Sequence, residues 1–434
     1  MRLAAGLVLI LGLLWVSLTL GVGNAADWAV VPSVTARTEF NSNLNYDFTA
    51  PKADYIFTLA PTANFNYTTD IGQLQGSLGL TGRHYLSNGQ IDHIDQNFQI
   101  NGRYQAAPRL NLNLNAAYIS DSSLQEEFAT SGLIMTRTPR QSIQAGPGVT
   151  YALTERLSAT VNYIFNKVNY QSPQFQNYTT QQAGLTLQQQ LKNERTVLIG
   201  NFLAQETHYP AGDNDARSLG FQLGGTHKFS PDWEVNFLGG INISFLDFHT
   251  QVLDFSQFPF FTTNQAKVQQ TTTSPFINLS FTHRWTDKFV ISGAYTRNQA
   301  ASAVGSMSDT NQLNLSLSYT FSDRLSGNLS GSYVLNNQIS DQNGFKSDFI
   351  GVTPQLTYRL TEEINLSPGY QFGLREDTSL GKSANAQTVF LMMTYTKLAV
   401  ASEKKPTAPV GTPPATAAGT GRPPFFGRIP FQLY

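Results

Sequence analysis

The feature that most constrains this chain is a two-residue alternation of apolar and polar side chains that recurs along most of its length. In "YIFTLAPTANFNYTTD", residues 55–70, the odd positions up to Tyr67 are apolar or aromatic, and the even positions are mostly small or polar. Such alternation places one kind of side chain on each face of a β-strand, and helical spacing does not fit it. About eighteen such segments of about 10–14 residues lie between Val30 and Leu398.

These segments predict a membrane barrel. They are longer than the strands of about 5–6 residues usual in globular proteins and long enough for the roughly 9–11 residues of a tilted membrane-crossing strand. Charged residues make up only 13% of the chain, whereas a soluble domain has about 25%. We therefore expect an all-β fold, a transmembrane antiparallel up-and-down β-barrel of about eighteen strands in the outer membrane of a Gram-negative bacterium. Its apolar face meets lipid, its polar face lines a lumen, and closure leaves no unpaired strand edge in hydrocarbon.

The connections between the segments fall into two alternating sets. One set is short, as in "TTDIG", "LTERL", "FSPDW" and "WTDKF". The other is longer and polar, as in "NSNLNYDFTAPKAD", "SDSSLQEEFATSGLIMTRTPR" and, the longest, the stretch around "FHTQVLDFSQFPFFTTNQAKVQQTT". Outer-membrane barrels have short periplasmic turns and long extracellular loops. Phe229 and Trp233 flank one short turn, and Trp285 and Phe289 flank another, which predicts an aromatic girdle at the membrane interface.

The two ends of the chain depart from the alternation. Residues 1–25 carry one Arg, a long apolar run and small residues at their end, the layout of a cleaved signal peptide. An uncleaved anchor is the alternative, because the apolar run is long. Residues 26–398 form the predicted barrel. Residues 399–434 are rich in Pro, Ala, Gly and Thr, which predicts an extended periplasmic tail without a packed core.

Few charged residues fall on the parity of the predicted lumen. The candidates for lining a pore are Arg37, Glu39, Arg83, Asp95, Arg103, Lys228, Glu234, Arg284 and Arg359. Arg83 and Asp95 flank a short loop, so we expect them to be diagonal neighbours across a hairpin. These charges either set a local field in a channel or form ion pairs that hold and solvate the wall. The remaining lumen positions are Asn, Gln, Ser and Thr, which hydrogen-bond hydroxylated solutes without selecting a charge.

Four aromatic residues, Phe255, Phe258, Phe260 and Phe261, lie in the longest predicted loop. Exposed rings of this number cost free energy unless they pack. They either fold into the channel mouth, as a constriction or a stacking surface for sugars, or pack on one another as a cap of the loop.

Composition and motifs argue against several other functions. The formal net charge of −1 leaves no basic surplus for binding nucleic acid. The absence of cysteine excludes disulfides and thiolate metal sites. The six histidines show no zinc-binding spacing, and His227 and His283 fall on the lipid parity beside girdle aromatics. No nucleophile and base can be paired from the sequence, so we expect no enzymatic activity and no cofactor.

The N-terminal strands also resemble a known family. The strand "VVPSVTARTEF", the loop "NSNLNYDF" and the strand "LAPTANFNY" are similar to those of an outer-membrane β-barrel porin family, the second β-barrel porin family, some of whose members are encoded with exopolysaccharide export systems. The resemblance covers most of residues 30–398. It implies an outer-membrane channel, with polysaccharide export as a candidate role.

Two functions follow as hypotheses. The first is a porin or channel, with exopolysaccharide export as its sharper version. The second is a structural sleeve that holds a partner, such as a cytochrome conduit, and needs apolar patches on the inward face. The segment "TVLIGNFLAQ" is the one whose inward parity is ambiguous. The expected partners are outer-membrane lipid and lipopolysaccharide, the barrel assembly machinery, and a periplasmic export or conduit partner reached through the tail.

Overall fold

The computed structural model describes residues 27–122, 137–211, 214–254, 262–303, 305–339, 346–397 and 400–401. Within these ranges the chain forms eighteen long strands, the two-residue strand β19 and one 3-10 turn, η1 (Gly89–Ile91). The strands are β1 (Asp27–Asn41), β2 (Asp54–Thr68), β3 (Gly72–Tyr85), β4 (His93–Ala107), β5 (Leu110–Ser122), β6 (Pro139–Ala152), β7 (Leu157–Tyr170), β8 (Tyr178–Gln190), β9 (Thr196–Tyr209), β10 (Asn214–Ser230), β11 (Trp233–Asp254), β12 (Thr262–Thr286), β13 (Phe289–Ala301), β14 (Met307–Thr320), β15 (Leu325–Ile339), β16 (Lys346–Arg359), β17 (Ile364–Asp377), β18 (Lys382–Thr396) and β19 (Val400–Ala401). In these ranges no helix is long and apolar enough to cross a membrane.

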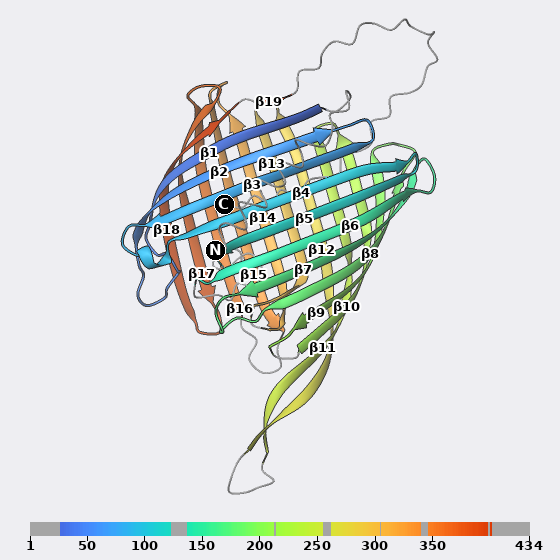
Figure 1. The fold of residues 1–434 in the computed structure, drawn as a ribbon, viewed down its shortest axis with the longest axis vertical. Helices are drawn as coiled ribbons and strands as arrows, with labels where there is room; N and C mark the ends of the chain where they lie inside the picture. Colours follow the sequence, from blue (N-terminus) through green and yellow to red (C-terminus); the bar gives the residue numbers. More distant parts are fainter. Residues whose placement is uncertain are drawn as a thin grey trace, which may run out of the picture. The chain divides into compact units, whose positions relative to one another are not determined.

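The strands close into a barrel (Figure 1). From β1 to β18, each pairs antiparallel with its neighbours in the chain, and β1 also pairs with β18, from Ser33 opposite Thr396 to Asn41 opposite Thr388. This confirms the predicted up-and-down barrel. Pairing continues past the predicted end at residue 398, because Val400 of β19 lies opposite Val30 of β1.

The longer connections all lie on one rim, as predicted, but two connections on that rim, 210–213 and 378–381, are only four residues long. The other rim carries the β2–β3 connection (69–71), the β4–β5 connection and every second connection after them. These are two to five residues long: 231–232 has two residues, and 191–195 has five. We call this rim the turn end. The opposite rim, which carries the β1–β2, β3–β4 and later alternate connections, is the loop end.

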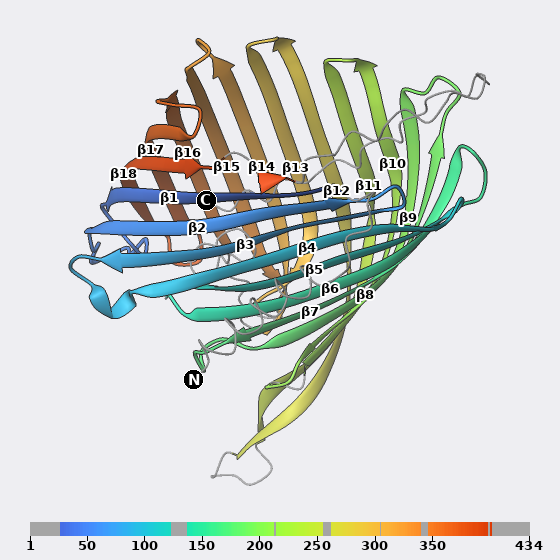
Figure 2. The same cartoon turned by 45° about the horizontal axis from the view of Figure 1, so that its top comes forward.

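The prediction for the longest loop is wrong. Most of "FHTQVLDFSQFPFFTTNQAKVQQTT" is strand, and β11 and β12 remain paired up to Asp254 opposite Thr262. Figure 2 shows this hairpin extending well beyond its neighbours. The error has a physical cause. Beyond the membrane, no lipid requires an apolar side chain at every second position, so this polar run can form strands without alternation. Its five Thr residues favour strand conformation. Phe255, Phe258, Phe260 and Phe261 lie outside the described residues.

The exterior of the barrel is apolar. The outward side chains of β2 include Tyr55, Phe57, Leu59 and Tyr67, each more than 40% exposed, which confirms the predicted lipid parity of this strand. Exposed Leu, Ile, Val and Phe side chains continue around the other strands.

Aromatic rings form a chain along the turn end, confirming the predicted girdle. The ring centroids of His227, Phe229, Trp233, His283 and Trp285 lie 4.5, 4.5, 5.7 and 5.6 Å apart in that order. Amphipathic rings at one level mark a membrane interface. A closed β-barrel with an apolar exterior and such a girdle is an outer-membrane protein. The turn end therefore faces the periplasm and the loop end faces the cell exterior.

Buried apolar side chains gather inside the barrel toward the loop end. One cluster contains Leu44, Ile56 and Tyr85, a second Val168, Tyr170 and Ala303, and a third Ala216, Leu246 and Met307. The loop end of the lumen is thus packed, and this is where a solute would meet the most closely spaced side chains.

Candidate functional site

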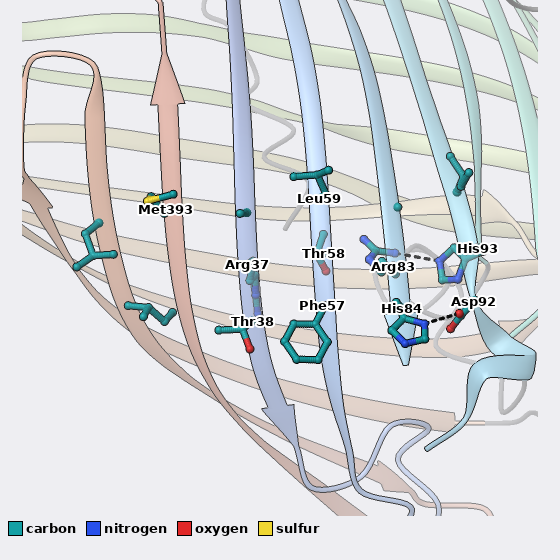
Figure 3. Close-up of a pocket in the computed structure, with 15 residues that line it drawn as sticks. Arg37, Thr38, Phe57, Thr58, Leu59, Arg83, His84, Asp92, His93 and Met393 are labelled. Carbon is teal, nitrogen blue, oxygen red and sulfur yellow. Dashed lines mark hydrogen bonds and ion pairs between the residues drawn. The ribbon is translucent and has the colours of Figure 1, made fainter. Parts of the chain in front are cut away.

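A row of ionic side chains crosses the inner wall from β1 to β6. In the strand register Arg37 lies opposite Thr58, Thr58 opposite Arg83 and Arg83 opposite His93. Figure 3 shows these residues on successive strands. We call Arg37, Glu39, Arg83, His93, Asp95, Asp121 and Arg140 the ionic row. Side chains at alternate strand positions face one side, so the register alone brings these residues onto the lumen face.

Within the ionic row each cation has an acidic partner. Arg37 is paired with Glu39. Arg83 Nη1 lies 2.6 Å from Asp95 Oδ2, as expected for diagonal neighbours. Arg37 also lies 4.0 Å above the ring of Phe390.

Arg140 and Asp121 form a bidentate ion pair, with N–O distances of 3.0 and 2.8 Å. Paired, partly buried ions keep their charges fixed in position and are weakly screened by salt. The row therefore presents a fixed, balanced charge pattern to the lumen.

His93 joins the row through both ring nitrogens. Its Nδ1 lies 2.8 Å from the carbonyl oxygen of Ile91, to which it donates. Its Nε2 lies 3.2 Å from Arg83 Nη1 and 3.3 Å from Asp95 Oδ1. The ring also stacks on Tyr85, which fixes its plane.

Arg137 adds a further cation above the row and ties the β1–β2 loop to the wall. Its guanidinium donates to the Tyr85 hydroxyl (2.7 Å), the Leu44 carbonyl (3.1 Å) and Asn45 Oδ1 (3.3 Å). Burial lowers the pKa of Arg137, but a guanidinium remains charged at neutral pH. Burial likewise raises the pKa of Tyr46 in the same loop to about 12.

The opposite wall differs. Between the turn-end rim and the buried loop end, the described inward-facing positions of β8–β18 carry no charged side chain. Amides and hydroxyls there bond to one another across strands: Asn328 Nδ2 donates to the hydroxyls of Ser316 and Ser318 at 3.0 and 2.9 Å, and Asn201 Nδ2 donates to Gln222 Oε1 at 3.1 Å. At the loop end this wall carries ions as well, because Arg375 and Asp377 of β17 are each only 1% exposed. The lumen is thus ionic at its loop end and neutral along its middle.

The remaining predicted pore residues lie near the turn end. Lys228 and Glu234 pair across the β10–β11 hairpin with an N–O distance of 3.5 Å and are largely exposed. Arg103 donates to Asn111 at 3.4 Å, and Arg359 donates to the Asp323 carbonyl at 2.6 Å. Arg284 is exposed at the end of β12. The structure therefore brings only Arg37, Glu39, Arg83 and Asp95 together, and the other five are spread along the periplasmic side.

Sequence reasoning missed Asp121, Arg137 and Arg140. The pair formed by Asp121 and Arg140 joins β5 and β6, whose connection includes 123–136, outside the described residues. These residues border a long polar stretch without alternation, so no parity could be assigned to them. Their opposite charges at the two ends of one predicted loop were the available signal.

The ambiguous segment "TVLIGNFLAQ" is resolved by its exposure. Leu198 and Phe202 are about half exposed on the outside, so Val197, Ile199 and Leu203 face the lumen. Leu238 of β11 also faces inward. These four side chains make a small apolar patch on the neutral wall.

A groove of about 900 Å³ lies on the outer face of the strands that carry the ionic row (Figure 3). Phe57, Leu59, Ile94 and Met393 line it. His84 and Asp92, paired at 2.6 Å, line the groove as well, so its wall is mostly apolar with one exposed ion pair toward the loop end. Within the described ranges no group of three His, Asp or Glu side chains is placed to hold a metal ion.

No protein-family model matches the chain, and no curated protein matches it. Solved structures share the fold class. OccAB3 of Acinetobacter baumannii is 11% identical, with 86% of this chain and 99% of that chain covered and a TM-score of 0.43. The outer membrane channel DcaP of A. baumannii is 10% identical, with 87% and 99% covered and a TM-score of 0.42. OccK2 (OpdF) of Pseudomonas aeruginosa is 11% identical, with 86% and 98% covered and a TM-score of 0.43. Similarity at this level carries no argument about solute or mechanism.

Proposed function

We propose that this protein is a non-enzymatic outer-membrane channel for hydrophilic solutes rich in hydroxyl groups, with oligosaccharides and exopolysaccharide as the favoured cargo. The observation that carries the proposal is the middle of the wall of β8–β18, between the charged residues of its two ends, where amides and hydroxyls line the lumen. A barrel of this strand number is too wide to be filled by its wall side chains.

The chemistry of this wall suits a sliding polymer. Selectivity in a pore comes from its width and the groups that line it, and conduction needs binding weak enough to release. A sugar chain can exchange one neutral hydrogen bond for the next along the wall. A small charged metabolite gains little from it. The ionic row is balanced, and Arg137 adds one cation, so the channel favours anions modestly.

The test is conductance of the purified protein in a planar bilayer, with and without neutral oligosaccharides, together with surface polysaccharide in a deletion strain. We expect an open channel, current reduced by oligosaccharide entry, and loss of surface polysaccharide. If the purified protein conducts but the deletion strain has normal surface polysaccharide, export is rejected and the channel function stands.

A structural sleeve is the second candidate, favoured by the inward apolar patch of Val197, Ile199, Leu203 and Leu238. A protein partner in the lumen would cover these side chains. If the protein is a sleeve, the barrel purified together with its partner should not conduct ions. Replacing Leu203 by Asn would then weaken retention of the partner, whereas the channel proposal predicts unchanged assembly and conductance.

For the tail we propose a tether. Residues 402–434, outside the described residues, would lie in the periplasm because an even strand number leaves both chain ends on that side. The segment "PPFFGRIPFQLY" would dock a periplasmic export partner. The signal for the barrel assembly machinery would be in β18, with Tyr395. Deleting residues 402–434 should leave insertion intact, and loss of insertion would move the assembly signal to Tyr434.

A further inference from the structure

The end of the β13–β14 hairpin separates from β12. β13 pairs with β12 only from Phe289 to Arg297, whereas it stays paired with β14 as far as Ala301, opposite Met307. We call residues 298–303 and 305–310, which form this hairpin end, the flap. The flap lacks β12 on one edge and keeps β15 on the other, where Met307 lies opposite Ile339.

The flap folds into the lumen. Met307 is 2% exposed and packs with Ala216 and Leu246, which face inward from β10 and β11. A neighbouring hydrogen bond runs from Ser274 of β12 to Asp309 Oδ1 at 2.7 Å. The flap therefore lies against the inner face of β10–β12.

The tip of the flap is held on the wall beyond, at β9. The Tyr209 hydroxyl donates to the Ser306 carbonyl at 2.7 Å and accepts from the Ser302 amide at 3.1 Å. The backbone N–H of Gln176, in the β7–β8 loop, donates to the Ala303 carbonyl at 2.7 Å. One side chain thus bridges both sides of the flap's turn, and the flap spans the inner face from β13 to β9.

Gly305 suits this position on two grounds. Its φ is +82°, a conformation that favours glycine. A Cβ at this position would lie 2.3 Å from Gln176 Oε1. A larger residue would strain the turn and push the flap away from its seat.

We infer that the flap sets the size limit of the channel and that Tyr209 is the positioning residue that holds it. The inference rests on the proposed channel function. The flap covers the lumen at the loop end on the side of β9–β12, and the ionic row occupies β1–β6. A solute passing the loop end moves between them, so displacing the flap widens the passage.

A cysteine pair tests the flap directly, because the natural chain has no cysteine. The backbone hydrogen bond between Gln176 and Ala303 brings their Cα atoms within reach of a disulfide. In Q176C/A303C combined with Tyr209→Phe, the reduced form should pass oligosaccharides above the wild-type size limit, and oxidation should restore that limit. Each single-cysteine variant combined with Tyr209→Phe should be insensitive to oxidant. Equal passage by the oxidised and reduced forms of the combined variant would overturn the inference.

Tyr209→Phe tests the positioning role. Losing both hydroxyl bonds should raise the frequency of large conductance steps about tenfold, and Gly305→Ala should act in the same direction. The matched control is Tyr163→Phe, which removes a hydroxyl bonded to Gln181 at 2.9 Å on the outer face and should match wild type. Heat-modifiable migration of each variant confirms folding. Identical recordings for Tyr209→Phe, Gly305→Ala and Tyr163→Phe would overturn the flap. No conductance in any variant would overturn the channel itself.

Discussion

The two ends of the lumen hold similar ion pairs in different surroundings. At the loop end Arg83 and Asp95 approach to 2.6 Å with side chains 20% and 14% exposed. At the turn end Lys228 and Glu234 lie 3.5 Å apart and are 56% and 39% exposed. Exposed pairs are screened by salt and contribute little, whereas half-buried pairs keep their field. If the proposed channel function holds, this comparison predicts that solutes are selected at the loop end and pass freely at the turn end.

The comparison first requires that inward and outward faces are assigned correctly. Phe237, four residues beyond the girdle residue Trp233 in β11, faces lipid and Asn236 faces the lumen, where it bonds Ser280 at 3.3 Å. Phe237→Arg should cost up to about 2–4 kcal/mol, because a charge then meets the bilayer hydrocarbon. Asn236→Arg should be tolerated. Urea unfolding in lipid vesicles measures both, and equal losses would mean that the faces are wrong.

The packed loop end should be more sensitive to loss of an arginine than the turn end. Arg137→Ala removes three hydrogen bonds from a buried guanidinium, and each bond to a charged group contributes about 1.5–3 kcal/mol. We expect the β1–β2 loop to become a site of rapid proteolysis. Arg359→Ala, which loses one bond at the exposed turn end, is the control and should stay resistant. Equal resistance would show that Arg137 does not hold the loop.

Alkaline pH should loosen the same loop. The pKa of Tyr46 is raised to about 12 by burial, above the ordinary tyrosine value of about 10. A raised pKa contributes stability that is present below the ordinary value and lost as pH rises through about 12. The protection of amides in residues 42–53, taken relative to their intrinsic hydroxide-catalysed exchange, should therefore fall between about pH 10 and 12, and Tyr46→Phe should abolish this fall. An unchanged fall in that variant would assign the effect to another group.

The strands and turns could be predicted because each position inside the membrane meets either lipid or water, and alternation records that choice. The contact of Arg83 with Asp95 could also be predicted, because the two residues flank the short connection of a single hairpin. The flap could not be predicted, because its contacts with Tyr209 join residues more than 90 positions apart. Its sequence "RNQAASAVGSMSDT" has the composition of an ordinary polar loop. Arg137 was missed for a related reason, since it follows the long β5–β6 connection, where no periodicity assigns a face.

Reversal potential in a KCl gradient tests the central claim most directly, using two matched neutralisations. Asp95→Asn removes the acidic partner of Arg83 at the packed loop end, and Glu234→Gln removes the partner of Lys228 at the open turn end. If selection occurs at the loop end, Asp95→Asn shifts the reversal potential toward the equilibrium potential of chloride. Glu234→Gln leaves the reversal potential at the wild-type value. A shift in Glu234→Gln as large as that in Asp95→Asn would contradict the account.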